Sequence, residues 1–292
     1  MTTERATAFV PGHVTAFFSA HPADDPAAAG SRGAGITLTD GVETTVAPSP
    51  SVTSETVAAD TVTLDGDPAT IGVVDDVLAA LGVADATARV AIESDLPVGA
   101  GFGVSGAAAL GTALAANDAF DLGRSENELV RTAHVAEVER GTGLGDVVAQ
   151  ARGGVPIRVQ PGAPGHGELD GIPASERVEY VTFGELSTEA VLAGDTSGLS
   201  AAGERALTTL RRDPRLSTLM TASREFAAGA DLLVPAVAEA LDAVEAAGGS
   251  ASMAMLGRTA FALGTGLSDA GYDPAVCHTH AAGARLVERD DA

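Results

Sequence analysis

The sequence predicts an α+β fold. Stretches with the alternating pattern of strands and stretches with helical spacing follow each other in irregular order, without the regular strand–helix repeat of a parallel α/β sheet. The chain has 292 residues, of which 45% are hydrophobic, so it can bury one large core or two modest ones. A segment rich in glycine and proline, residues 161–173, is the best candidate boundary and divides the chain into domains 1–160 and 161–292.

Short strands are expected in the first third of the chain. Residues 36–46 alternate between apolar and polar positions on either side of an Asp-Gly pair at 40–41, which predicts two strands joined by a tight turn. Residues 61–64 form a further short strand pattern before a second Asp-Gly pair. Residues 89–93 have the composition of a buried strand.

Helices are expected between these strands and the boundary. Apolar residues have helical spacing over residues 73–81, and again over residues 107–117, after a cluster of glycines. Ser125 and Glu128 form a capping-box pattern that opens another helix, which runs to about residue 140.

The rest of the chain alternates less regularly. Residues 155–159 and 178–183 have strand patterns on either side of the boundary. Several helical stretches follow the second of these strands, and the glycine pair at 248–249 ends the last of them. This irregular order supports the α+β class.

Composition excludes several classes of partner. The chain carries 40 acidic residues against 17 basic ones, all arginine, and its formal net charge is −23. Such a surface repels nucleic acid and anionic lipid, so we expect neither as a partner. No apolar run reaches the roughly 20 residues that span a bilayer, and the N-terminus lacks a signal-peptide pattern, so we expect a cytoplasmic location. The acidity is typical of a protein from a salt-rich cytosol, because salt screens the self-repulsion.

The densest cluster of glycine lies at residues 97–111. Gly101, Gly103 and Gly106 satisfy the G-x-G-x-x-G pattern of a dinucleotide-binding turn, so a nicotinamide-dependent oxidoreductase is one alternative. A Rossmann unit also needs a further parallel strand that ends in an acidic residue. A second helical pattern follows the glycine cluster instead, which argues against this alternative.

The same glycines fit an anion site better. Successive backbone N–H groups converge in a glycine-rich turn, and the following helix directs the positive end of its dipole to the same point. Ser105 adds a hydroxyl that can reach a phosphate or a phosphate-bound metal. A Walker-type loop is excluded because the chain contains no lysine. A flexible connector without a ligand is less favoured, because so many glycines leave the segment little reason to be ordered.

Residues 97–108 resemble the second signature motif of the GHMP small-molecule kinases, P-x-x-x-G-L-G-S-S-A-A. Phe102 replaces the usual leucine and Val104 replaces the first serine, while Ser105 occupies the position of the second serine. In this family the loop wraps the phosphates of ATP, and the second serine helps to hold Mg²⁺. The resemblance therefore implies that the cofactors are ATP and Mg²⁺. The nucleotide-binding residues that it implies are Pro97, Gly99, Ala100, Gly101, Phe102, Gly103, Val104, Ser105 and Gly106.

Other segments resemble the remaining family motifs in the same order. Residues 9–15 are similar to the first motif, with His13 at its basic position, and residues 142–154 are similar to the segment that carries the catalytic aspartate. Residues 249–263 stand where the third motif is expected but have lost most of its glycines. The resemblance implies a two-lobed GHMP kinase fold, with an N-terminal lobe like domain 2 of ribosomal protein S5 and a ferredoxin-like C-terminal lobe.

Two acidic residues and His13 carry the chemistry that the resemblance implies. Asp146 stands at the position of the catalytic aspartate, where it accepts or orients the proton of the attacking hydroxyl; the alternative is a helix N-cap. Glu137 is expected to hold Mg²⁺ together with Ser105, with Glu139 as the other candidate. His13 replaces the lysine of many relatives, so it either partners Asp146 or binds substrate.

Within the family, the departures from the common motifs are similar to those of archaeal pantoate kinases. That resemblance implies transfer of the γ-phosphoryl group of ATP to the primary hydroxyl of pantoate, giving 4-phosphopantoate on the route to coenzyme A. Because arginine suits a carboxylate, we expect Arg32 and Arg258 to bind pantoate, together with His13 and Thr15.

Two alternatives stay open at this point. A kinase for another small alcohol, such as mevalonate or homoserine, would carry the same motifs. A non-catalytic nucleotide-binding protein would keep the fold, and the degraded third motif is compatible with this. A homodimer is also compatible with the sequence.

Overall fold

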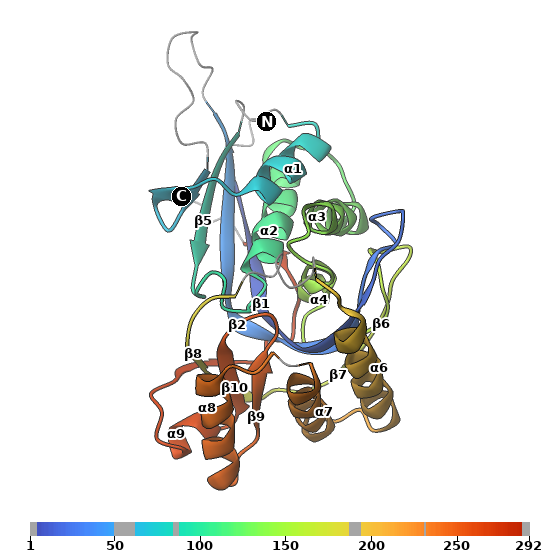
Figure 1. The fold of residues 1–292 in the computed structure, drawn as a ribbon. Helices are drawn as coiled ribbons and strands as arrows, with labels where there is room; N and C mark the ends of the chain where they lie inside the picture. The colour runs from blue at the N-terminus through green and yellow to red at the C-terminus, as the bar shows by residue number, and fades with distance from the viewer. Residues whose placement is uncertain (1–4, 50–61, 84–87, 187–193, 231, 288–292) are drawn as a thin grey trace.

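Two β-sheets with helices packed against them form the structure, a computed structural model that describes residues 5–49, 62–83, 88–186, 194–230 and 232–287 (Figure 1). The first sheet runs in the order β12-β1-β2-β5-β3-β4, and β2 also pairs with β6, which pairs with β7. Its strands are β1 (Ala6–His21), β2 (Gly30–Pro48), β3 (Val62–Leu64), β4 (Asp67–Pro68), β5 (Ala88–Ser94), β6 (Val155–Gln160), β7 (Glu168–Ile172) and β12 (Arg285–Leu286).

The long strand β2 branches the first sheet. Its second half pairs with β5, from Val42 to Pro48, while Gly33 and Ala34 near its start pair with β6. Neighbours are antiparallel except β3 and β5. Antiparallel sheets combined with helices confirm the α+β prediction.

The tight turn predicted at Asp40-Gly41 is wrong. β2 runs through this pair without reversing, and Gly41 lies opposite Pro11 of β1. A side chain at Gly41 would overlap the carbonyl oxygen of Val10 and approach the ring of Phe9 to 2.7 Å. The glycine therefore permits the close approach of a neighbouring strand instead of a chain reversal.

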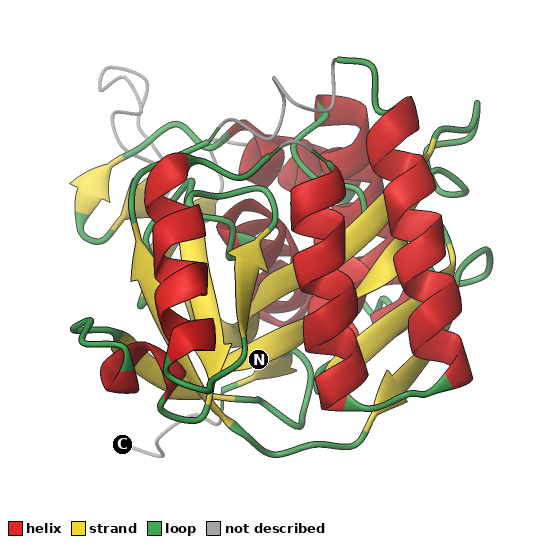
Figure 2. Ribbon diagram, turned by 60° about the horizontal axis from the view of Figure 1, so that its bottom comes forward, coloured by secondary structure: helices red, strands yellow, loops and turns green. Residues whose placement is uncertain are grey.

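The second sheet has the order β11-β8-β10-β9. Its strands are β8 (Arg177–Thr182), β9 (Ala251–Ala254), β10 (Thr259–Leu263) and β11 (Ala275–His278). Helices stand between β8 and β9 and between β10 and β11, so the strand order is fourth, first, third, second in a β-α-β-β-α-β unit. This is the ferredoxin-like arrangement that the family resemblance implies. Figure 2 shows the helices packed across the strands.

The helices of the first half lie where their local signals predict. α3 begins with the full capping box, in which the Ser125 side chain accepts from the Glu128 backbone N–H and the Glu128 side chain accepts from that of Ser125. α1 ends just before Gly82, which has a φ of 76°. The helices of this half are α1 (Gly72–Ala80), α2 (Val104–Ala119), α3 (Glu126–Arg140) and α4 (Asp146–Arg152).

The helices of the second half cover the lower part of Figure 1. They are α6 (Ser197–Arg212), α7 (Leu216–Gly229), α8 (Pro235–Ala246) and α9 (Gly266–Asp269). A glycine with a φ of 84°, Gly248, follows α8 at the predicted break. In the described part of the chain, none of the helices combines the length and the apolar character that crossing a membrane would need.

Two further expectations concern strand burial and domain division. β5 buries alternate residues and exposes Arg89, Ala91 and Glu93, so it is half-buried and not the fully buried strand expected.

The segment 161–173 contains β7, which pairs with β6 of the first sheet. The division into domains 1–160 and 161–292 stays a prediction.

Candidate active site

A cleft of about 280 Å³ gathers most of the residues predicted for the site. It lies between the glycine loop before α2, the turn before α4, and the region where β1, β2 and β6 meet. The predicted residues that line it are Thr15, Gly99, Gly101, Phe102, Gly103, Val104, Ser105, Gly106, Glu137 and Asp146.

The glycine loop forms one wall of this cleft and leads directly into α2. Gly99, Gly101 and Gly103 have φ values of 74°, 91° and 66°, a region that side chains other than glycine rarely adopt. Gly103 is the N-cap of α2 and supplies no side-chain hydrogen bond, so the first N–H groups of the helix stay available. The wall therefore has the features of an anion site.

Three other segments hold the glycine loop in place. The side-chain amide of Gln150, on α4, donates to the carbonyl of Gly103 at 2.9 Å. Thr259 donates to the carbonyl of Ala100 at 2.8 Å, and the backbone N–H of His13 donates to that of Phe102 at 2.9 Å.

The weak third motif contacts the loop directly. A side chain at Gly257 would overlap the carbonyl oxygen of Ala100, and one at Gly101 would come within 3.1 Å of the Ala254 carbonyl oxygen. The segment has lost glycines in sequence, yet it keeps one where the two backbones touch.

Ser105 and Glu137 meet beside the glycine loop. The Ser105 hydroxyl donates to Oε1 of Glu137 at 2.5 Å, and Thr142 donates to the same oxygen at 2.8 Å. Glu137 is only 3% exposed, and burial raises its pKa to about 7 although both hydroxyls and Arg140 oppose this. Glu139, the other candidate, is exposed and does not line the cleft.

The donor set at this point fits Mg²⁺. Serine and carboxylate oxygens are hard ligands, and Mg²⁺ commonly combines one or two protein ligands with phosphate oxygens and water. A cation beside Glu137 would also compensate the cost of its buried charge. The described residues contain no group of three or more His, Cys, Asp or Glu side chains arranged as metal ligands, so most other ligands would have to come from the nucleotide and water.

Asp146 also lines the cleft, at the first turn of α4. Its Oδ1 accepts from Nδ1 of His13 at 2.7 Å and from the Thr15 hydroxyl at 3.2 Å. Burial alone would raise the pKa of Asp146, but His13, Arg158 and Thr15 outweigh it and lower the pKa, so the group is a carboxylate. The N-cap of α4 is Gly145, with no side-chain cap, so the alternative role of Asp146 as an N-cap is wrong.

His13 stands behind Asp146 and is fully buried. Burial lowers the pKa of His13 more than Asp146 raises it, so the ring is neutral and its Nδ1–H donates to the carboxylate. Among the described residues, no hydrogen-bond partner reaches its Nε2. A side chain at Gly35, on the neighbouring strand β2, would overlap this nitrogen. The ring therefore fills the space that Gly35 leaves open.

Arg158, which was not among the residues predicted from the sequence, lines the wall of the cleft beside Gly145. It is 2% exposed, and within the described chain neither Nε nor Nη1 finds a hydrogen-bond partner. Burial lowers its pKa, and the negative charge of Asp146 opposes this. Ser31 also lines this wall, and a side chain at Gly145 would come within 2.5 Å of its Oγ and 2.7 Å of Arg158 Nε. A buried guanidinium with two unbonded nitrogens beside a hydroxyl is suited to bind a carboxylate.

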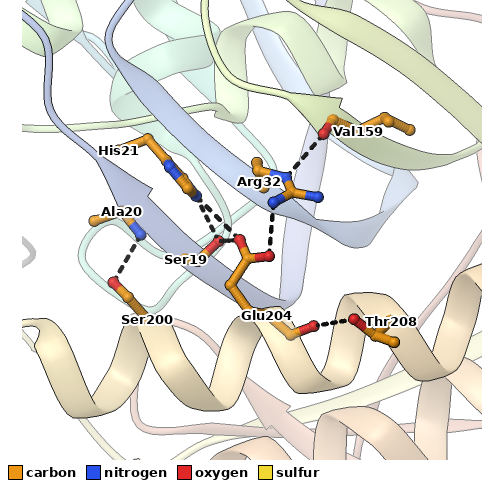
Figure 3. Close-up of polar contacts among 8 residues, drawn as sticks. All are labelled: Ser19, Ala20, His21, Arg32, Val159, Ser200, Glu204 and Thr208. Atoms are coloured by element: carbon orange, nitrogen blue, oxygen red, sulfur yellow. Dashed lines mark hydrogen bonds and ion pairs between the residues drawn. The ribbon is translucent and has the colours of Figure 1, made fainter.

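Neither arginine predicted for the substrate lines the cleft. Arg32 forms an ion pair with Glu204 of α6 at 2.6 Å and donates from Nε to the carbonyl of Val159 at 2.9 Å (Figure 3). Arg258 is exposed beside Gly184.

Two residues predicted for the nucleotide also do not line the cleft. Pro97 is exposed at the start of the glycine loop, and Ala100 is buried beneath it. The other residues of the predicted loop line the cleft, together with Glu137 and Asp146, whereas Arg32 and Arg258 do not.

This arrangement has the parts of a phosphoryl-transfer site, and the comparisons agree. The family model described as the N-terminal domain of the GHMP kinases matches residues 69–154. A homoserine kinase from Cytophaga hutchinsonii, 17% identical, shares the fold with a TM-score of 0.69 over 97% of this chain and 98% of its own. The chain belongs to the GHMP kinases.

Its curated relatives within the family are pantoate kinases. The chain is 36% identical to that of Thermococcus kodakarensis, over 88% of this chain and 86% of the relative. It is 34% identical to that of Methanospirillum hungatei, over 89% and 88%. A solved structure described as a phosphotransferase related to the CoA biosynthesis pathway is 29% identical, with a TM-score of 0.84 over 97% of this chain and 98% of that one.

Proposed function

We propose that this chain is an ATP-dependent pantoate kinase, which transfers the γ-phosphoryl group to the primary hydroxyl of pantoate and produces 4-phosphopantoate for coenzyme A biosynthesis. Its similarity to three pantoate kinases over most of the chain supports this function. The structural observation that carries it is Arg158, a buried cation in the same cleft as Asp146, whose Nε and Nη1 have no hydrogen-bond partner within the described residues. An acceptor that carries a carboxylate near its hydroxyl would give Arg158 a hydrogen-bond partner and place the hydroxyl beside Asp146.

The glycine loop serves the phosphate side of the reaction. The N–H groups of Gly101, Gly103 and the start of α2 hold the phosphates of ATP, because the loop and the helix end provide fixed donors in the cleft. Ser105 and Glu137 are the residues that hold Mg²⁺. When bound, Mg²⁺ supplies positive charge to the phosphates.

Asp146 and the wall formed by Ser31 and Arg158 bind and orient the acceptor. Arg158 and Ser31 hold the carboxylate of pantoate, which directs its primary hydroxyl toward Asp146. The hydroxyl oxygen forms a bond to the γ-phosphorus, the bond from phosphorus to the bridging oxygen of ADP breaks, and the hydroxyl proton passes to Asp146. His13 and Thr15 orient the Asp146 carboxylate throughout.

The test measures ADP release in potassium salt buffer with pantoate, mevalonate, homoserine or pantothenate as the acceptor. Pantoate should give the largest stimulation. Pantothenate is the sharpest control, because it keeps the primary hydroxyl but carries an amide where pantoate carries its carboxylate. Equal use of both would remove the role of Arg158, and stimulation by mevalonate or homoserine alone would favour the other small-alcohol kinases. If no alcohol stimulates ADP release, the chain is a non-catalytic nucleotide-binding protein.

We also propose that the protein works in a salt-rich cytoplasm. The chain carries 40 acidic residues against 17 basic ones, which supports this, because salt weakens the repulsion between so many negative charges. A homodimer stays a prediction. Loss of activity in dilute buffer and its recovery in concentrated potassium chloride would support the salt requirement.

A further inference from the structure

A cluster of four polar side chains lies outside the cleft, at the contact between α6 and the first sheet (Figure 3). Its centre is Glu204 of α6. One of its oxygens accepts from Nη1 of Arg32 at 2.6 Å, and the other accepts from the Ser19 hydroxyl at 2.6 Å and from Nε2 of His21 at 3.1 Å. Partial burial alone would raise the pKa of Glu204, but Ser19, His21 and Arg32 together hold it below its usual value. The group is therefore an ionised carboxylate with three donors.

The same face of α6 also contacts the backbone of β1. The Ser200 hydroxyl accepts from the backbone N–H of Ala20 at 3.0 Å. A side chain at Gly203 would overlap the carbonyl oxygen of Phe18, a residue that lines the cleft. Ser200, Gly203 and Glu204 follow the i, i+3, i+4 spacing of one helix face, so α6 is fixed against the end of β1 at three points.

Arg32 extends this contact to the strand that carries Arg158. The paired positions of β2 and β6 are Gly33 with Arg158 and Ala34 with Ile157, so the regular ladder ends at Arg158. One position further, Nε of Arg32 donates to the carbonyl of Val159 and adds a bond beyond the end of the ladder. Arg32 also directly follows Ser31, which lines the cleft together with Arg158.

We infer that Glu204 is a positioning residue for the acceptor: by holding Arg32 against Val159, it fixes the ends of β2 and β6 and so the places of Ser31 and Arg158 in the cleft. The inference rests on the proposed function. The side chains of Arg32 and Glu204 are 27% and 37% exposed, and ion pairs that exposed contribute little to stability. The pair therefore acts on the geometry of the cleft and not on the stability of the fold.

The experiment compares Glu204→Gln with the wild-type enzyme in steady-state kinetics for pantoate and for ATP. The glutamine still accepts from Ser19 but no longer attracts Arg32. We expect the KM for pantoate to rise about tenfold, and the KM for ATP and kcat to stay within about twofold. Arg32→Gln should have the same effect, and the double variant should be no worse than either single one, because both remove one contact.

A fall in the KM for pantoate would overturn the inference. If Arg32 itself binds the pantoate carboxylate, Glu204→Gln releases it and the KM for pantoate falls. An unchanged KM for pantoate, or equal rises for pantoate and ATP with a lowered melting temperature, would also overturn it. Glu225→Gln on α7 removes the same charge from an exposed site and should change neither constant.

A further variant keeps the test decisive if Glu204→Gln does not fold. Arg32→Lys retains a positive charge for Glu204 but lacks the two-sided guanidinium that reaches both Glu204 and Val159. We expect a three- to tenfold rise in the KM for pantoate, and no change would contradict the inference. A wild-type enzyme that does not phosphorylate pantoate would refute the proposed function instead, which separates the two failures.

Discussion

The two walls of the cleft are built in different ways. The donor wall, as we call the residues that the proposed function assigns to ATP and its metal, consists of residues 99–106 in one continuous stretch and Glu137 of α3. The acceptor wall consists of Phe18, Ser31 and Arg158, which lie on β1, β2 and β6 and meet through strand pairing.

This difference decides what a sequence reveals. The backbone of the donor wall is left-handed at Gly99, Gly101 and Gly103. Because glycine adopts this conformation most readily, the wall is visible in the sequence as closely spaced glycines. The acceptor wall needs only ordinary residue types in the correct register. Arg158 then resembles any arginine in a strand, and it is distinguished only by its burial and by the two nitrogens that lack partners in the described fold.

The largest expected effect belongs to Asp146, which stands between the two walls. Asp146→Asn keeps the shape of the side chain but loses the acceptor for the hydroxyl proton, so kcat should fall by about 10³. The KM values for ATP and pantoate should stay within a few-fold. Single-turnover phosphorylation, with circular dichroism to check folding, measures this. A folded variant that retains most of its turnover would remove Asp146 from the chemistry.

Arg158 tests the acceptor wall alone. Arg158→Met should raise the KM for pantoate about 300-fold, which corresponds to the loss of roughly two charge-assisted hydrogen bonds, and leave the KM for ATP unchanged. The ligand-free variant should change little in stability, because the loss of a buried charge with two unbonded nitrogens offsets the loss of its attraction to Asp146. Kinetics and thermal unfolding check the two parts. Equal rises in both KM values would mean that the walls are not independent.

Glu137 tests the donor wall without any ligand. Its pKa of about 7 in the fold, against 4.5 for the free group, means that the folded protein holds an extra proton between these values. In metal-free protein the stability that Glu137 contributes is complete below about pH 4.5 and is lost as the pH rises through 7, by about 3 kcal/mol at most. Urea unfolding of wild type and Glu137→Gln from pH 5 to 8 measures it. Parallel curves would contradict the shift, and the exposed Glu139→Gln is the control.

The smallest effect is expected from Gln150, which supports the donor wall from α4. Gln150→Leu removes the donor to the Gly103 carbonyl and should raise the KM for ATP about fivefold, near the value of one neutral hydrogen bond. The KM for pantoate should not change. Gln160→Leu, at an exposed position, is the matched control in the same assay. A rise confined to pantoate would reverse the assignment of Gln150 to the donor wall.

Elements with local signals were predicted well from the sequence. The capping box of α3 and the glycine that ends α1 act within one helical turn, so both boundaries were found. The turn at Asp40-Gly41 was wrong because the glycine serves a neighbouring strand that the local pattern does not contain. The prediction that Arg32 binds the carboxylate rests on residue type and on its glycine-rich segment, and neither reveals its ion-pair partner Glu204, which lies on a helix far along the chain.

The space shared by His13 and Gly35 has a consequence for the divergence of related sequences. The two residues lie on adjacent strands, and the imidazole occupies the volume that any larger residue at position 35 would take. A relative with a side chain at position 35 must therefore lack this histidine or turn its ring away from the aspartate. The two positions should vary together, so a substitution at position 35 alone would mark a member whose acceptor chemistry has changed.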